Sequence, residues 1–273
     1  MRTAVSFGIK CIGFLLLWGL LAVAAIPLSE TAAFLTGSGA YAQLCRNGTA
    51  LAAAGVVAFL ISKTFLPEQS LRRQMGARPG DGLWMGAGFG VFWAAGTLLA
   101  FRLSGGLHFI RQEMAVQDLG VWIAALACGV LTQGILAHGL FYPAMEGQFS
   151  RNAALVGSAV LFAALHFPQW KYGPAAFLGL LAMGLVLSLL RRYFGGILAP
   201  AAAHFVWDFA AGILFGGFPF DPYPSVIQIS LNGPAWLSGG QAGMMGSLLT
   251  MAVTLGAAAL LALYVSRKKR KKA

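Results

Sequence analysis

Eight long apolar segments run through this chain, and they limit its possible folds more than any other feature of the sequence. They cover residues 7–28, 49–67, 83–103, 118–145, 152–167, 174–193, 196–216 and 243–266. A helix needs about 20 mostly apolar residues to cross the ~30 Å hydrocarbon core of a bilayer, whereas a barrel strand needs only about 9–11. The segments therefore predict an all-α fold, a polytopic membrane bundle of about eight transmembrane helices.

The composition excludes the main alternatives to a membrane protein. Only 10% of the residues are charged and 58% are hydrophobic, whereas a soluble domain carries roughly 25% charge and a disordered chain has low hydrophobicity. The three cysteines, Cys11, Cys45 and Cys128, are spaced too widely for a disulfide scaffold or a CxxC metal site. The net charge of +11 is concentrated in the basic run 267–272, which lacks interleaved aromatic residues. It predicts contact with anionic lipid, and no nucleic-acid binding.

The basic residues also predict an orientation. Eight spans place both termini on one side, and that side then holds the terminal basic run together with Arg2, Lys10, Lys63, Arg72, Arg73, Arg78, Arg151, Arg191 and Arg192. The other side holds only Arg46, Arg102, Arg111 and Lys171. The positive-inside rule makes the richer side the cytoplasm. We expect the first segment to be kept as a helix, because its apolar run of about 17 residues is long for a cleaved signal peptide.

Few polar side chains fall inside the apolar segments. They are His138 and Gln133 in the fourth, His166 at the end of the fifth, and His204 with Asp208 in the seventh. Because ionisable groups are costly inside a membrane, they are candidates for function, for lining a transport path, or for structural hydrogen bonds. His204 and Asp208 lie four residues apart and share one helix face, as do Phe162 and His166.

These residues resemble the motifs of the intramembrane CAAX-type proteases, also called the CPBP or Abi family. That family shows Glu-Glu-x-x-x-Arg, then Phe-x-x-x-His, then His-x-x-x-Asn/Asp on successive helices. The matching stretches are Phe162-Ala-Ala-Leu-His166, Gly195-Gly196-Ile-Leu-Ala-Pro200-Ala-Ala-Ala-His204-Phe-Val-Trp-Asp208, Gly139-Leu-Phe-Tyr-Pro143 and Gly233-Pro-Ala-Trp-Leu-Ser-Gly239-Gly240. The resemblance implies three parts: N-terminal helices in 1–117, a CAAX-protease-like core in 118–250, and the end of the last helix with a basic tail in 251–273. Its likeness to bacterial members implies a place in the bacterial inner (plasma) membrane.

The resemblance implies a role for each matching residue. His166 matches the second-motif histidine, which in the family is thought to activate the attacking water together with a glutamate. His204 and Asp208 match the third-motif pair, which is thought to steady the oxyanion. The glutamates themselves are replaced, because Gln133 and Gly134 fall at their positions and His138 falls at the arginine.

The replacements remove the general base. The amide of Gln133 cannot accept a proton near neutral pH, and Gly134 has no side chain, whereas a positioned base is worth about 10²–10⁴ in rate. Without the carboxylates, an arginine at position 138 would be an unpaired buried charge, so a neutral His138 is consistent with their loss. We therefore expect a family member that is weakly active or catalytically inactive and that binds a prenylated or membrane-embedded peptide.

Two alternatives remain open. In the first, the protein is an active protease with an altered metal site, in which His138, His166 and His204 bind zinc and make hydroxide without a glutamate. Asp208 would then orient His166 or His138 from the second shell. In the second, the protein is a non-enzymatic membrane protein that serves binding, immunity or transport.

Overall fold

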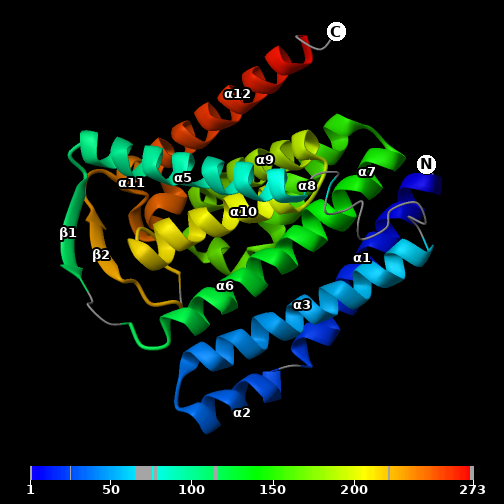
Figure 1. The fold of residues 1–273 in the computed structure, drawn as a ribbon, viewed down its shortest axis with the longest axis horizontal. Helices are drawn as coiled ribbons and strands as arrows, with labels where there is room; N and C mark the ends of the chain where they lie inside the picture. Colours follow the sequence, from blue (N-terminus) through cyan, green and yellow to red (C-terminus); the bar gives the residue numbers. More distant parts are fainter. Residues whose placement is uncertain are drawn as a thin grey trace.

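The structure is a computed structural model that describes residues 2–24, 26–64, 76, 79–112, 116–220 and 222–270. Within these ranges the chain forms a bundle of long helices with one small pair of strands (Figure 1). Figure 1 places the beginning of α1 and the end of α12 on the side away from the strands. Five of the basic residues used to predict the orientation lie outside the described residues: Arg72, Arg73, Arg78, Lys271 and Lys272.

The expected all-α membrane bundle is confirmed. Its helices are α1 (Arg2–Val23), α2 (Ile26–Thr36), α3 (Gly39–Thr64), α5 (Pro79–Leu103), α6 (Leu119–Gln133), α7 (Tyr142–Gln148), α8 (Arg151–Leu165), α9 (Pro174–Phe194), α10 (Leu198–Trp207), α11 (Ala235–Ser238) and α12 (Leu248–Arg270). Two π-helical segments, η1 (Gly134–Phe141) and η3 (Asp208–Leu214), continue α6 and α10, and two 3₁₀ segments, η2 (Phe167–Tyr172) and η4 (Gly240–Gly246), precede α9 and α12.

Not all of the eight expected segments form helices long enough to span a membrane. Six apolar helical stretches in the described residues are long enough to cross a membrane: Ser6–Thr36, Gly39–Ile61, Pro79–Leu103, Leu119–Gln148, Pro174–Phe194 and Gly240–Tyr264. The fifth and seventh expected segments form the shorter apolar stretches Arg151–Leu165 and Leu198–Leu214. At 1.5 Å per residue the 15-residue α8 is about 22 Å long, so it ends before it has crossed ~30 Å of hydrocarbon.

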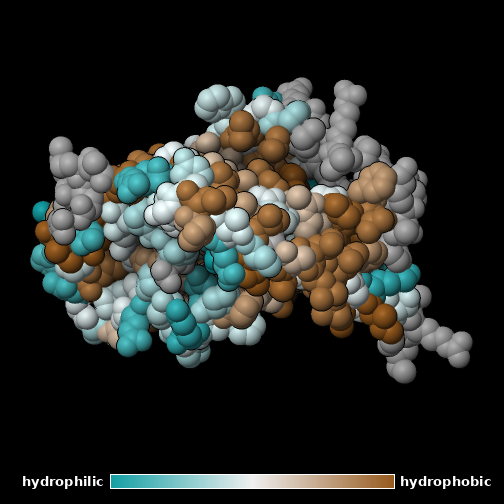
Figure 2. Space-filling model, turned by 90° about the horizontal axis from the view of Figure 1, so that it is seen from below, coloured by the Kyte–Doolittle hydropathy of each residue, from teal (hydrophilic) through white to brown (hydrophobic). Residues whose placement is uncertain are grey.

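The outer surface of the bundle suits lipid. Large apolar side chains are exposed on α1, α5 and α12, among them Leu16 (62%), Trp84 (76%), Phe92 (56%) and Leu260 (57%). Figure 2 shows apolar side chains gathered in a broad area of one face. Soluble proteins rarely expose apolar patches larger than a few hundred Å², so these faces indicate an integral membrane protein.

A pair of short strands joins two loops at one end of the bundle. β1 (Leu107–Gln112) pairs in antiparallel fashion with β2 (Ile227–Leu231), and Leu107 lies opposite Leu231 (Figure 1). Both strands lie outside the eight apolar segments, in the stretches 104–117 and 217–242. The pairing satisfies backbone groups of both loops and ties the segment after α5 to the segment after η3.

Helix α5 packs closely against α10 through small residues. A Cβ added to Gly86 would lie 2.2 Å from the carbonyl oxygen of Ala199, and one added to Gly90 would lie 2.8 Å from that of Ala203. Small residues every four positions allow such backbone contact in a membrane. Because α10 carries His204, these contacts fix the helix that carries part of the candidate site.

Aromatic packing and hydrogen bonds extend this contact to the last helix. The rings of Trp93 in α5 and Trp207 in α10 stack with their centroids 4.4 Å apart. The indole Nε1 of Trp93 donates a hydrogen bond of 2.9 Å to the hydroxyl of Thr254 in α12. Helices from all three expected parts of the chain therefore share one core.

Candidate functional site

The first-motif positions lie where α6 changes into a π-helix. Gln133 ends α6, Gly134 begins η1, and His138 lies in the middle of η1, buried to 1% exposure. In this segment the amide of Tyr142 bonds to the carbonyl of Ala137, five residues back. A π-helical turn inside an α-helix is rare and is frequent at functional sites.

Pro143 explains why the turn is wide and why the backbone carbonyl of His138 has no backbone donor. In the same five-residue pattern the carbonyl of His138 would accept a hydrogen bond from residue 143, but proline has no amide hydrogen. The guanidinium of Arg191 in α9 takes its place, and its Nε donates to the His138 carbonyl oxygen over 2.8 Å. Arg191 is only 8% exposed, and its guanidinium lies 5.6 Å from the centre of the Tyr142 ring.

The ring of His138 is held by Ser158 of α8. The Ser158 hydroxyl donates to the carbonyl oxygen of Ala137 over 2.7 Å, and its Oγ lies 3.0 Å from Nδ1 of His138. The hydroxyl has one hydrogen, so Nδ1 of the neutral ring must donate to Oγ, and Nε2 then carries no proton. That Nε2 is buried and has no hydrogen-bond partner among the described residues.

His166 caps the end of α8. Ser150 starts this helix, and its side chain accepts a hydrogen bond from the amide of Ala153. At the other end Nδ1 of His166 lies 2.8 Å from the carbonyl oxygen of Phe162, and because a carbonyl only accepts, Nδ1 carries the proton. Nε2 of neutral His166 is therefore also the unprotonated nitrogen.

His204 and Asp208 lie where α10 passes into η3. Nε2 of His204 is 3.0 Å from Oδ2 of Asp208, and both side chains are buried. The carboxylate is out of line with the ring N–H, so within the described part of the chain Nε2 has no hydrogen bond of good geometry. This contact corrects the expectation that Asp208 orients His166 or His138: two side chains four residues apart meet on one helix face.

Phe162 stands at the centre of the three histidines. Its ring centroid lies 4.5 Å from that of His166, 5.1 Å from that of His204 and 6.3 Å from that of His138. The rings of His166 and His204 are 6.0 Å apart. The structure thus brings His166, His204 and Asp208 together in the bundle, and it places His138 beside the same phenyl ring.

The side chains do not fit the three-histidine zinc site. Such a site needs three nitrogens about 2.0–2.1 Å from one metal ion, hence within about 4 Å of one another. The Phe162 ring lies among the three histidines, in contact with His166 and His204 and beside His138. In the described ranges no group of three or more His, Cys, Asp and Glu side chains is placed to hold a metal ion.

Sequence reasoning missed Ser158 and Arg191. Ser158 could have been found, because 158, 162 and 166 lie at four-residue intervals on one face of a helix. Arg191 gave a weaker signal, since it read as one of the cations at a helix end. Its partner could be expected only from Pro143, which leaves a carbonyl without a donor.

Comparison with known families agrees with the resemblance. Residues 115–210 match the Rce1-like family model, described as type II CAAX prenyl endopeptidase Rce1-like. The match covers roughly a third of the chain and contains every first-, second- and third-motif position, from Gln133 to Asp208. The stretch 233–240 lies beyond it. No curated protein and no solved structure matches the chain.

Proposed function

We propose that this chain, whose residues 115–210 form an Rce1-like domain of the CAAX protease family, binds a membrane-embedded or prenylated peptide and cleaves it weakly or not at all. The observation that carries the proposal is the set of buried polar atoms left unpaired at the motif positions. Among the described residues they are Oε1 of Gln133 and Nε2 of His138, together with Nε2 of His204, whose 3.0 Å contact with Oδ2 of Asp208 lacks hydrogen-bond geometry. A buried polar group without a partner costs about 1–3 kcal/mol.

A peptide backbone complements these three atoms. Oε1 of Gln133 and the unprotonated Nε2 of His138 are acceptors, which an amide N–H can satisfy. Nε2 of His204, held beside the Asp208 carboxylate, carries a proton and is a donor for a carbonyl oxygen. Two acceptors and a donor in a buried site would fix the direction of a bound peptide, in the same way that a few placed polar groups orient ligands elsewhere.

Catalysis is weak in this proposal because the base is missing. His204 can steady a developing oxyanion, with Asp208 as the counter-charge for its ring. No carboxylate stands at 133 or 134 to take the proton from water, and that loss costs about 10²–10⁴ in rate. The family's metal would lose its carboxylate ligand at the same positions, so no step of this proposal uses a metal.

A second candidate is an active enzyme that uses His138 as its base. The hydrogen bond with Ser158 favours it, because a fixed Nδ1–H leaves Nε2 free to accept a proton. This Nε2 lies in the same aromatic cluster as His166 and His204. The two candidates differ in one measurable quantity, the turnover of the unaltered protein.

The test compares binding with turnover in the same vesicles. A fluorogenic farnesylated CAAX-type peptide is added to the reconstituted wild type and to the triple variant Gln133→Glu, Gly134→Glu, His138→Arg. We expect the wild type to bind the peptide with turnover at background, and the triple variant to gain turnover at the same level of protein. Position 134 has room for the Cβ of a glutamate, because a Cβ there would lie 3.7 Å from Cβ of Ala201, an ordinary van der Waals distance.

Each alternative has its own outcome. Robust wild-type turnover that His166→Ala abolishes would establish the active enzyme and contradict the missing-base argument. Absence of peptide binding to a correctly folded wild type would contradict the binding role. Solute flux into the proteoliposomes would indicate the transport alternative, for which histidines line a polar path.

The orientation belongs to the same proposal. We place both termini in the cytoplasm, because exposed Arg151 and Arg192 lie at the helix ends on the side of the termini. In a bacterial cell this membrane is the inner (plasma) membrane. A protease added to sealed right-side-out vesicles should leave the C-terminal basic run intact, whereas cleavage of that run would reverse the orientation.

A further inference from the structure

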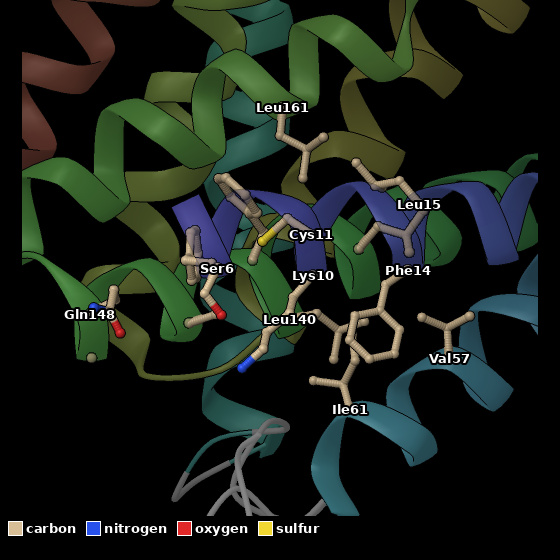
Figure 3. A pocket seen from close by; sticks show the side chains of 15 residues that line it. Ser6, Lys10, Cys11, Phe14, Leu15, Val57, Ile61, Leu140, Gln148 and Leu161 are labelled. Atoms are coloured by element: carbon tan, nitrogen blue, oxygen red, sulfur yellow. The ribbon is translucent and has the colours of Figure 1, made fainter. Parts of the chain in front are cut away.

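A cavity of about 540 Å³ lies on the other side of η1 from the candidate site. It is lined by residues of α1, α3, α8 and the η1–α7 segment (Figure 3). Leu136 and Leu140 of η1 face this cavity, while His138 between them faces Phe162. The volume is in the range of ~300–1,000 Å³ that ligand pockets occupy.

The lining of the cavity changes from polar to apolar along its length. Polar Ser6, Lys10 and Gln148 lie toward one end, and apolar Phe14 and Leu15 line the other (Figure 3). Phe14 follows Ser6 by eight residues of α1, which corresponds to about 12 Å along the helix axis. The cavity therefore has a polar mouth, and its lining becomes apolar over about 12 Å along α1.

The polar mouth lies at the basic end of the bundle. Gln148 ends α7, two residues before Ser150 caps α8, and exposed Arg151 follows at once. Exposed Arg192 near the end of α9 bonds to Asn152, so it lies at the same level. The side chain of Lys10 is itself exposed. This end of the protein would sit at a bilayer surface with its positive charges among the lipid headgroups.

We propose that this cavity binds one acyl chain of an anionic phospholipid, whose phosphate lies at Lys10 and Ser6. Water is a poor occupant of an apolar cavity. The acyl chains of the lipids next to α1 are the nearest apolar groups that can fill it. A lysine at the surface attracts an anionic headgroup, and basic pockets between membrane helices are known to bind such lipids. The inference rests on the cavity and does not depend on peptide cleavage.

The bound chain would complete the packing of α1. Much of this helix faces lipid: Ile9 is 66% exposed, Ile12 60% and Leu20 71%. Phe14 of α1 packs against the cluster that contains Leu136 and Leu140 of η1, beside the cavity. An acyl chain in the cavity would extend this packing and support η1 from behind, on the face opposite to His138.

The test counts lipids that stay bound to the full-length protein. Protein reconstituted separately with dioleoyl phosphatidylglycerol and with dioleoyl phosphatidylcholine is extracted in mild detergent and measured by native mass spectrometry. We expect one phosphatidylglycerol per chain to resist delipidation and phosphatidylcholine to be lost. Lys10→Gln should lower the preference for phosphatidylglycerol about five-fold, the effect of one surface lysine.

Two neighbouring residues supply a matched pair for the cavity itself. Leu15→Trp puts a larger side chain into the cavity and should reduce the bound lipid, whereas Leu16→Trp faces the bilayer, where Leu16 is 62% exposed, and should not. Melting temperatures show that both variants are folded. Equal retention of both lipids, unchanged by Leu15→Trp, would overturn the proposal. So would displacement of phosphatidylglycerol by a farnesylated peptide at equal concentration, which would assign the cavity to the prenyl chain.

Discussion

Arg191 donates a hydrogen bond from its guanidinium Nε to the carbonyl oxygen of His138, across 2.8 Å and 53 positions of sequence. The carbonyl is open because Pro143 cannot supply the amide that the π-helical pattern requires. A charged side chain from α9 thus stabilises the wide turn at the first motif. The resemblance implies that the family's arginine falls at position 138, and here an arginine from another helix contacts the backbone of that residue.

Arg191→Leu should destabilise the protein. The His138 carbonyl would be left buried without a donor, which costs about 1–3 kcal/mol in the free energy of unfolding. Thermal melting in detergent measures the effect, and about 1 kcal/mol corresponds to ~2–4 °C at this chain length. The control Arg192→Leu should melt within a degree or so of wild type. Equal melting temperatures for the two variants would show that the hydrogen bond contributes nothing.

Ser158→Ala and Ser188→Ala should differ although both serines are fully buried. Ser158 bonds to Ala137 and to the ring of His138, so its loss should cost about 1–3 kcal/mol. Oγ of Ser188 has no hydrogen-bond partner among the described side chains and backbone, so its replacement should be neutral or stabilising. The melting temperatures of the two variants show which is less stable. A larger loss of stability for Ser188→Ala would contradict the hydrogen bonds assigned to Ser158.

Ser158 should also fix the tautomer of His138. In ¹⁵N-histidine spectra the wild-type ring should carry its proton on Nδ1, and Ser158→Ala should give a mixture of the two tautomers. Ser158→Thr keeps the hydroxyl and should keep the wild-type pattern if it folds. A wild-type ring protonated on Nε2 would reverse the assignment.

Gly86→Ala and Gly88→Ala give a second matched pair, in α5. A Cβ at Gly86 would come within 2.2 Å of the Ala199 backbone, and one at Gly88 meets nothing within 4 Å. The first change should force α5 and α10 apart and lower the melting temperature by several degrees. The second should raise it slightly, since alanine favours a helix by about 1 kcal/mol over glycine. If both alanines behave alike, the two helices are not packed as described.

Zinc loading should leave the purified wild type with far less than one zinc per chain. The histidine rings surround a phenyl ring and do not converge on a point. Metal analysis after gel filtration measures the content, with His138→Ala beside the wild type. One zinc per wild-type chain that His138→Ala releases would establish the three-histidine site instead.

The sequence predicted the parts of the site that depend on the free-energy cost of polar groups in lipid and on the spacing of residues along a helix. Polar groups are expensive in lipid, so the gathering of His166 and His204 inside the bundle could be expected, as could the shared face of His204 and Asp208. The contact of Arg191 could not, because it depends on a local change from an α-helix to a π-helix. The pairing of β1 with β2 joins segments more than a hundred residues apart, and neither strand is long enough to show a clear alternating pattern.

The shortness of α8 has a consequence for the membrane around it. This helix covers about 22 Å, and the η2 segment that follows it ends in Trp170, Lys171 and Tyr172, residue types that settle at the headgroup level. A bilayer adapts to a helix of short hydrophobic length by becoming thinner around it. The leaflet on the side of η2 would therefore dip beside α8 and bring its surface close to half-buried His166. Hydrophobic mismatch would give water a short route to the histidines from that leaflet, with no channel through the rest of the bundle.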